Sequence, residues 1–294
     1  MAGRFAPSPT SDLHLGNLRT ALLAWLFARS SGREFLLRIE DLDTLRVAAA
    51  PEVAARQIAD LTALGLDFDG EPVWQSHRLA TYARAVDRLD TYECFCTRRE
   101  IAEAASAPHD DGYRPYPGTC RDLSEDDRAA RRRTRPPAIR VRAVGATQTV
   151  TDRWAGDVTG VVDDFVVVRN DGVPAYNLAV VVDDIAQGVD QVVRGDDLLS
   201  SSPRQAWLTR QLGGMVPEFA HVPLAVNPDG RRLAKRDGAV TLADLARNGV
   251  TATQVLAQLA CSLGMAGGNE HVTPANLLRR LNPDALPRTP WVVT

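Results

Sequence analysis

Predicted strands and helices alternate at the start of the chain, and the alternation returns near residue 190. The first group, judged from apolar spacing and from glycine and proline boundaries, consists of strands at 4–6 and 34–39 and helices at 15–29, 51–64 and 79–92. The second group consists of a strand at 191–193, a helix at 202–212 and a strand at 221–226. Such alternation predicts a doubly wound α/β domain, in which helices cover both faces of a parallel sheet.

The stretch between the two groups has a different character. Residues 94–135 are polar, contain three cysteines and are interrupted by proline and glycine. Short strands are predicted at 138–144, 148–150, 165–169 and 176–182. The last two flank Asn170, Asp171 and Gly172, a sequence typical of a β-hairpin. An antiparallel segment therefore interrupts the α/β pattern.

These patterns divide the chain into four predicted segments. They are the first half of the α/β domain at 1–92, an inserted α+β domain at 93–188, the second half at 189–236 and a short helical tail at 237–294. The tail has helical spacing at 241–247, 252–263 and 274–281.

The composition is that of a globular protein with a sizeable core. The 294 residues are 45% hydrophobic and carry 34 basic and 37 acidic side chains, for a net charge of −3. These values exclude a disordered chain and a histone-like protein, while a local basic patch for nucleic acid stays compatible with them. The longest apolar stretch, 21–28, is too short for a membrane helix, and residues 1–9 lack a signal-peptide core. We expect a cytoplasmic monomer with no membrane partner.

One detail of the composition concerns the basic residues. Thirty-three of them are arginine, and one, Lys235, is lysine. A GC-rich genome replaces lysine by arginine wherever either residue serves. Lysine is a compact point charge and arginine a planar fork, so the two differ where tight geometry matters. Lys235 is therefore either a chance survivor or a position that rejects arginine.

Two segments have the chemistry expected of a phosphate site. Residues 6–17 leave a predicted strand and open a predicted helix, whose N-terminus offers N–H groups and positive potential to a phosphate. Gly16 would let a nucleotide approach the backbone, and His14 would donate to a phosphate oxygen, although a histidine here is also a common helix cap. Residues 231–238 form a basic loop suited to clamp a triphosphate, and alone would be taken for an exposed turn.

Together the two segments resemble the two signatures of class I aminoacyl-tRNA synthetases. Residues 14–17, His-Leu-Gly-Asn, stand where that class has HIGH, and residues 232–236 stand where it has KMSKS. Segments that resemble the glutamyl enzymes of the class follow the same order along the chain: 38–43, 75–78, 164–184 and 194–197. The resemblance implies a Rossmann-type catalytic domain that activates L-glutamate with ATP and Mg²⁺.

The resemblance also implies the site residues. The L-glutamate site is implied at Arg4, Phe5, Ala6, Pro7, Ser8, Glu40, Tyr176 and Arg194. The ATP site is implied at His14, Gly16, Asn17 and Lys235, with His14, Gly16 and Lys235 as the catalytic residues. These residue types suit the roles, because arginine forks bind carboxylates, a glutamate binds an ammonium and a tyrosine supplies a hydroxyl. A structural ion pair is the alternative for Glu40 and Arg194.

The signatures depart from the family pattern at three positions. Asn17 replaces the second histidine of the first signature, and Arg232 and Ala234 replace the first lysine and the serine of the second. Lys235 remains as the lysine that the family uses on ATP.

Three clustered cysteines predict a structural zinc site rather than disulfides. Three ligands are available at Cys94, Cys96 and Cys120. Zinc requires a fourth, for which His109 is the ordinary candidate. The resemblance instead implies a C-x-C…Y-x-x-x-C pattern in which Tyr116, rather than Tyr113, is the fourth ligand. Three free buried thiols are the alternative, and Cys261 is expected in the core.

An arginine cluster lies within the predicted insertion, at Arg131, Arg132, Arg133 and Arg135. Most charge runs are solvated faces of a protein. The resemblance places this segment where the family contacts tRNA, so a role on the phosphate backbone is the second interpretation.

The tail at 237–294 is too short for the anticodon-binding domain of a full glutamyl-tRNA synthetase. In this respect the chain resembles the glutamyl-queuosine tRNA(Asp) synthetase family. That family activates L-glutamate without tRNA and transfers it to the queuosine base at the wobble position of tRNA(Asp). Three alternatives stay open: a minimal glutamyl-tRNA synthetase charging a tRNA 3′ end, a non-catalytic RNA-binding relic, and an unrelated nucleotidyltransferase.

Overall fold

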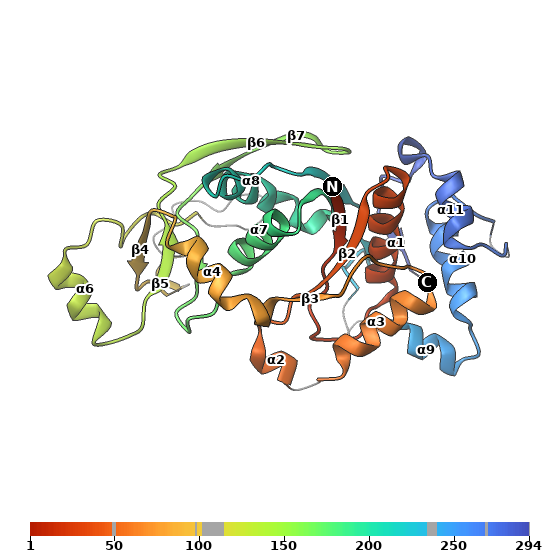
Figure 1. Ribbon diagram of the computed structural model, residues 1–294, viewed down its shortest axis with the longest axis horizontal. Helices are drawn as coiled ribbons and strands as arrows, with labels where there is room; N and C mark the ends of the chain where they lie inside the picture. The colour runs from red at the N-terminus through yellow and green to blue at the C-terminus, as the bar shows by residue number, and fades with distance from the viewer. Residues whose placement is uncertain (49–50, 98, 102–114, 234–239, 268–269, 294) are drawn as a thin grey trace.

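The computed structural model describes residues 1–48, 51–97, 99–101, 115–233, 240–267 and 270–293. Figure 1 shows a central sheet that lies between a small sheet at one end of the molecule and the C-terminal helices at the other. Within the described residues, no helix is both long and apolar enough to cross a membrane.

The central sheet combines both halves of the chain. Among the described residues it has seven strands, in the order β3 (Val73–Trp74), β2 (Glu34–Ile39), β1 (Ala2–Phe5), β9 (Val189–Gly195), β10 (Glu218–Val222), β6 (Ala146–Asp152) and β7 (Gly156–Val162). Neighbouring strands from β3 to β6 are parallel, and β6 and β7 form an antiparallel pair. The predicted α/β fold is therefore confirmed, as a Rossmann-like mixed sheet.

The pairing of β1 with β9 sets the place for a site. The chain order reverses between these two strands, so the connections from their carboxyl ends run in opposite directions along the sheet. A crevice forms at such a switch point, outside the carboxyl ends of the parallel strands.

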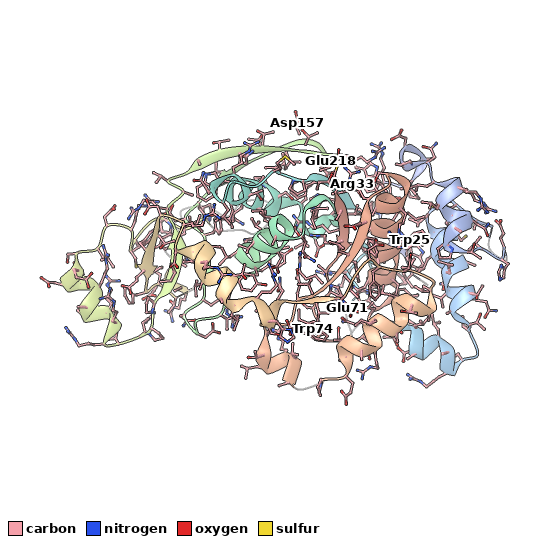
Figure 2. All side chains as sticks on the ribbon, in the orientation of Figure 1. Trp25, Arg33, Glu71, Trp74, Asp157 and Glu218 are labelled. Carbon is pink, nitrogen blue, oxygen red and sulfur yellow. The ribbon has the colours of Figure 1, made fainter. Side chains whose placement is uncertain are left out.

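Charge pairs hold the opposite, amino-terminal edge of the sheet. Arg33 precedes β2 and forms ion pairs with Asp190 of β9, at 2.9 Å, and with Glu218 of β10, at 3.4 Å. Figure 2 shows Arg33 and Glu218 near each other. One planar guanidinium therefore bridges strands that are far apart in sequence.

Helix α1 (Leu15–Ser30) connects β1 to β2 and is buried along nearly its whole length. It packs against β1, β2 and β9 and against two helices of the tail, α10 (Ala252–Ser262) and α11 (Pro274–Arg280). This double packing explains why its apolar residues are not confined to one stripe. The helix ends at Ser30 and is capped by Ser31, which is followed by Gly32 with φ of 69°.

The helices of the tail are those that the sequence predicted. Besides α10 and α11 the tail contains α9 (Leu242–Arg247), whose first turn is capped by Thr241. A further short strand, β12 (Trp291–Val292), was not predicted, and it pairs in parallel with β11 (Ala225–Val226). Further helices are α2 (Thr44–Ala48), α3 (Val53–Ala63), α4 (Leu79–Val86), α6 (Glu125–Arg132) and α8 (Ser202–Gln211).

Two predicted elements are wrong, and the single strand predicted at 221–226 is divided between β10 and β11. The strand predicted at 176–182 is part of a helix, α7 (Tyr176–Ala186), although the chain does turn at Gly172, with φ of 81°. Leu178 to Asp184 are all buried, so this run carries no alternation that separates a strand from a helix. The helix predicted at 79–92 ends at Val86, and Thr91–Cys94 forms strand β4, because the chain there pairs with a distant partner.

Residues 91–168 contain a second, antiparallel sheet of β4, β5 (Ala138–Val141) and β8 (Val166–Val168). Asp164 joins its loops. Its carboxylate accepts hydrogen bonds from the Tyr92 hydroxyl and Arg121 Nε, both at 2.6 Å, and from the backbone N–H groups of Ala143 and Val144. The same range also contributes β6 and β7 to the central sheet.

Candidate active site

A cavity of about 470 Å³ opens at the carboxyl ends of β1, β2 and β9. Its lining includes the segment after β1, Glu40 directly after β2, and Gly195 at the end of β9. Tyr176, from the first turn of α7, and Arg232, beyond β11, complete two of its sides. The cavity therefore lies at the switch point of the sheet, where ligands bind in folds of this type.

The cavity brings together the predicted glutamate-site and ATP-site residues that the structure describes. They are Arg4, Phe5, Ala6, Pro7, Ser8, His14, Gly16, Asn17, Glu40, Tyr176 and Arg194. Lys235 lies outside the described residues, as does Ala234. The cavity thus places the predicted amino-acid site and most of the predicted ATP site in one continuous space.

His14 is the N-cap of helix α1. Its Nδ1 accepts hydrogen bonds from the N–H groups of Gly16, at 3.1 Å, and Asn17, at 3.2 Å, and Asn17 Oδ1 accepts from the His14 N–H. The Leu15 N–H donates to the Val240 carbonyl. The expectation that this helix start offers free N–H groups to a phosphate is therefore wrong, because the cap occupies them.

The cap fixes what His14 can still do. Since Nδ1 accepts two hydrogen bonds, the ring proton of the neutral imidazole is on Nε2, which becomes the donor. Burial, and next the charge of Arg232, lower the pKa of His14 to about 4. The side chain is therefore neutral near pH 7 and presents one N–H.

Gly16 is required by packing. A Cβ atom at this position would lie 3.0 Å from the Ala225 Cβ and 3.0 Å from atoms of the His14 ring. Gly16 also lines the cavity, and the close approach of a nucleotide to its backbone stays a prediction. Gly16 lets helix α1 approach β11 while the His14 ring caps the helix.

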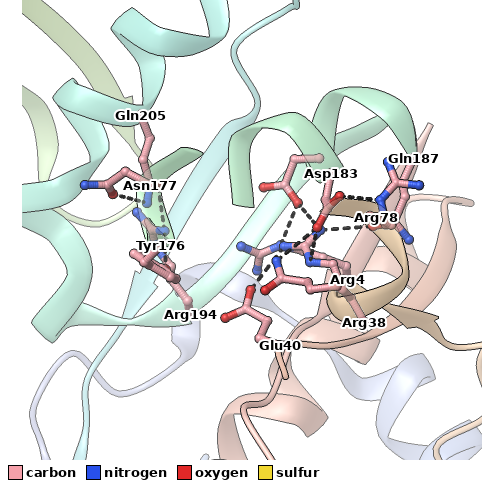
Figure 3. A network of polar contacts seen from close by, with 12 residues as sticks. Arg4, Arg38, Glu40, Arg78, Tyr176, Asn177, Asp183, Gln187, Arg194 and Gln205 are labelled. Carbon is pink, nitrogen blue, oxygen red and sulfur yellow. Dashed lines mark hydrogen bonds and ion pairs between the residues drawn. The ribbon is translucent and has the colours of Figure 1, made fainter. Parts of the chain in front are cut away.

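Ion pairs connect Arg4 and Glu40, which line the cavity, with Arg38 and Asp184 (Figure 3). Arg38 Nη1 donates to Asp184 at 2.7 Å, Arg4 Nε donates to the same carboxylate at 3.4 Å, and Arg38 Nη2 lies 3.4 Å from Glu40. Burial raises the pKa of Glu40, while Arg38 and Arg4 act in the opposite direction. Glu40 is thus a nearly buried carboxylate whose one ion pair within the described part of the chain is long, a suitable partner for an ammonium group.

Sequence reasoning did not assign roles to Arg38 and Asp184. Each is a charged residue within an apolar element, Arg38 in β2 and Asp184 in α7, and both are buried. A buried charge needs a partner, so a charge in a run of apolar residues was the available signal. The partner itself, 146 residues away, could not be read from that signal.

Arg194, on β9, lies beside Tyr176. Its guanidinium is buried, donates to Gln205 Oε1 at 2.7 Å and lies 3.4 Å from the Tyr176 hydroxyl. Arg194 and Arg4 thus place two cations at the wall of the cavity. The structural ion pair considered for Arg194 is absent among the described residues.

Comparison with known proteins identifies the fold and the family. A model of the catalytic domain of class I tRNA synthetases specific for E and Q matches residues 1–293. The chain is 60% identical to a glutamyl-Q tRNA(Asp) synthetase of Nocardia farcinica, over 100% of this chain and 93% of that protein. It is 59% identical to the protein of the same description in Cutibacterium acnes, over 90% and 76%. The chain belongs to the glutamyl-Q tRNA(Asp) synthetase family.

Solved structures agree with this assignment. A glutamate tRNA ligase of Elizabethkingia meningosepticum, in complex with its amino acid, superposes with a TM-score of 0.81 at 27% identity. A glutamate-tRNA synthetase of Elizabethkingia anophelis gives the same TM-score at 28% identity. The matches cover 99% of this chain but 66% and 67% of those proteins, so the chain spans about two thirds of their length. The protein is an enzyme of the class I aminoacyl-tRNA synthetase type, a ligase.

The three predicted cysteine ligands lie together, outside the cavity. The Sγ atoms of Cys94, Cys96 and Cys120 are all within 4.8 Å of one another, and those of Cys96 and Cys120 are 3.6 Å apart. The Tyr116 hydroxyl is 3.5 Å from Cys94 Sγ and 3.8 Å from Cys96 Sγ. The alternatives His109 and Tyr113 lie outside the described residues. Cys261, expected in the core, is exposed, since it lies on the outer face of α10.

The arginine cluster is largely engaged within the protein. Arg132 forms ion pairs with Glu93 and Glu125, and Arg135 donates to the Phe95 carbonyl. The pair between Arg132 and Glu93 fastens α6 to β4 of the small sheet, and the acidic first turn of α6 interacts favourably with the helix dipole. Arg133 is exposed.

Proposed function

We propose that this protein activates L-glutamate with ATP and transfers the glutamyl group to the queuosine base at the wobble position of tRNA(Asp). One observation carries the first half of this proposal. A single cavity is lined by Arg4, Arg194 and Glu40 and also by His14 and Arg232. The first set matches the two carboxylates and one ammonium of glutamate, and the second matches phosphates.

Activation is the attack of the glutamate α-carboxylate on the α-phosphorus of ATP, with pyrophosphate as the leaving group. Binding both substrates in one cavity converts the reaction into an effectively unimolecular one. His14 would donate its Nε2–H to a phosphate oxygen, and Arg232 and Lys235 would balance charge on the departing pyrophosphate. Magnesium bound with ATP neutralises phosphate charge.

Transfer is the attack of a hydroxyl of the queuosine cyclopentenediol on the activated glutamyl carbonyl, with AMP as the leaving group. The names of the Nocardia farcinica and Cutibacterium acnes relatives support this acceptor.

The cysteine cluster fits a structural zinc ion. At Zn–S of about 2.3 Å and Zn–O of about 2.0 Å, a tetrahedron places sulfur atoms about 3.8 Å apart and sulfur and oxygen about 3.5 Å apart. The distance between Cys96 and Cys120 and those from the Tyr116 hydroxyl lie close to these values. We therefore assign Cys94, Cys96, Cys120 and Tyr116 as the ligands, within an inserted domain at 93–188.

Two measurements test the function. Glutamate-dependent ATP–pyrophosphate exchange without tRNA is expected, and its absence would reject the activation step and favour a non-catalytic relic. Labelling from [¹⁴C]glutamate is then measured on tRNA(Asp) whose 3′-terminal diol is blocked by ligation. Labelling that survives the block and requires queuosine supports base modification. Labelling lost on blocking would instead favour a minimal glutamyl-tRNA synthetase.

A further inference from the structure

The guanidinium of Arg194 is buried among neutral partners. Its five N–H groups face the following acceptors: His221 Nε2 at 3.0 Å, Gln205 Oε1 at 2.7 Å, Ser202 Oγ at 2.9 Å, the Leu198 carbonyl at 3.3 Å and the Tyr176 hydroxyl at 3.4 Å. Among the described residues it has no carboxylate as an ion-pair partner. A buried cation without a counter-charge is costly, so the site is built to receive an anion.

The five contacts fall into two sets. The three short ones come from His221, Gln205 and Ser202, which do not line the cavity. The two long ones come from Leu198 and Tyr176, which do line it. The short contacts therefore hold the guanidinium plane from behind, and the long ones mark the two N–H groups that a carboxylate can take over bidentately.

His221 can accept the hydrogen bond from Arg194 in only one tautomer, and Asp152 stabilises that tautomer. Asp152 Oδ2 lies 2.7 Å from His221 Nδ1 and accepts the His221 backbone N–H at 2.9 Å. Burial opposes ionisation of Asp152, but the hydrogen bonds from His221 and from two backbone N–H groups lower its pKa overall. A carboxylate is only an acceptor, so the ring proton is on Nδ1 and Nε2 keeps its lone pair for Arg194.

We propose that His221 and Asp152 are positioning residues, which hold Arg194 in the orientation that binds a carboxylate of glutamate while leaving its positive charge unbalanced. The inference rests on the proposed function. A carboxylate in direct contact with Arg194 would orient it equally well but would neutralise it. The neutral imidazole separates the Asp152 charge from the guanidinium, so the substrate supplies the missing negative charge.

Three variants test whether His221 and Asp152 position Arg194. The amide of His221→Gln reaches the position of Nε2 and still offers an acceptor to Arg194, whereas that of His221→Asn reaches only the position of Nδ1. Asp152→Asn is isosteric, but its amide donates to Nδ1 and forces the proton onto Nε2, against the Arg194 N–H. We expect His221→Asn and Asp152→Asn to raise KM for glutamate at least tenfold in pyrophosphate exchange, and His221→Gln at most threefold. KM for ATP is expected to change less than twofold in all three.

The matched control is Thr209→Val, on the same helix as Ser202 and Gln205. Its buried hydroxyl donates only to the Gln205 carbonyl of its own helix, so KM for glutamate should stay unchanged. Thermal unfolding checks that each variant is folded. If His221→Asn does not fold, KM for glutamate in Asp152→Asn still tests the inference. Equal effects of His221→Asn and His221→Gln, or a parallel rise of KM for ATP, would overturn the inference. No exchange by the unchanged protein would instead overturn the proposed function.

Discussion

Arg232 and Asp197 form an ion pair of 2.5 Å at the cavity wall, joining the segment after β9 to the loop after β11. Arg232 stands at the first lysine position of the second signature. Its side chain is 60% exposed, so the pair contributes at most about 1 kcal/mol to stability. A triphosphate carries more negative charge than Asp197. Arg232 can therefore leave Asp197 and bind the triphosphate at a small cost in free energy.

Replacing Arg232 by alanine should therefore weaken ATP binding and leave the fold intact. We expect KM for ATP to rise about tenfold, equivalent to ~1.4 kcal/mol, with little change in KM for glutamate. The matched control is Arg231→Ala, which removes an exposed arginine of the same loop that does not line the cavity. Equal effects of the two substitutions would mean that only the net charge of the loop matters.

His14 has two separable functions, one on each ring nitrogen. His14→Asn keeps a side-chain oxygen that can cap Gly16 and Asn17, but it lacks the Nε2–H. We expect pyrophosphate exchange to fall at least a hundredfold in His14→Asn, while the free energy of unfolding stays within about 0.5 kcal/mol. His14→Ala should lose the same activity and in addition about 1 kcal/mol of stability. Normal pyrophosphate exchange by His14→Asn would mean that His14 caps the helix and takes no part in activation.

The low pKa of His14 also predicts a pH dependence of stability. Its pKa is about 4 in the folded protein and 6.5 by default when unfolded, so between these values the unfolded chain binds more protons. The contribution of His14 to stability is therefore present above pH 6.5 and is lost as pH falls to 4. Urea unfolding across this range should show a steeper decline for the unchanged protein than for His14→Asn. Equal slopes would contradict the assignment of His14 as a buried, neutral cap.

Local patterns predicted the parts of the site that are contiguous in sequence. Residues 4–17 leave a strand and enter a helix, and both elements follow from apolar spacing and from prolines. The residues of the first signature therefore lie at the cavity as one continuous segment. By contrast, the contacts of Asp184 with Arg38 and of Asp152 with His221 join residues 146 and 69 positions apart, and no local pattern encodes such pairs.

The misassigned helix α7 has a similar physical origin. Val180, Val181 and Val182 favour a strand by intrinsic propensity, and the preceding turn suggested a hairpin. In the structure this run is buried between α4, α8 and β9, and tertiary packing overrides the propensity. This helix also shapes the site. It places Tyr176 in its first turn, where the hydroxyl contacts Arg194, and Asp184 two turns later, where the carboxylate contacts Arg4.

Val144 stores backbone strain. Its φ is 54°, a left-handed conformation that a β-branched residue rarely adopts, and its side chain is 63% exposed. Val144→Gly should therefore raise the free energy of unfolding by about 1 kcal/mol, measured by urea denaturation. Val161→Gly is the matched control, since Val161 is 60% exposed in strand β7, where φ is ordinary, and glycine should destabilise it. Destabilisation of both variants would show that Val144 makes a compensating contact.

Lys235 provides the sharpest test of the second signature. It is one lysine among 33 arginines, and it falls where the family uses a lysine on ATP. Because an ammonium is a compact point charge and a guanidinium a wider planar fork, Lys235→Arg keeps the charge but changes the geometry at the phosphates. We expect adenylate formation, measured by pyrophosphate exchange, to fall at least tenfold, a loss of ~1.4 kcal/mol in the barrier, with unchanged thermal unfolding. The matched control is Arg232→Lys, which restores the family lysine three residues earlier in the sequence and should keep most activity. Near-normal exchange by Lys235→Arg would make the single lysine an accident of codon usage.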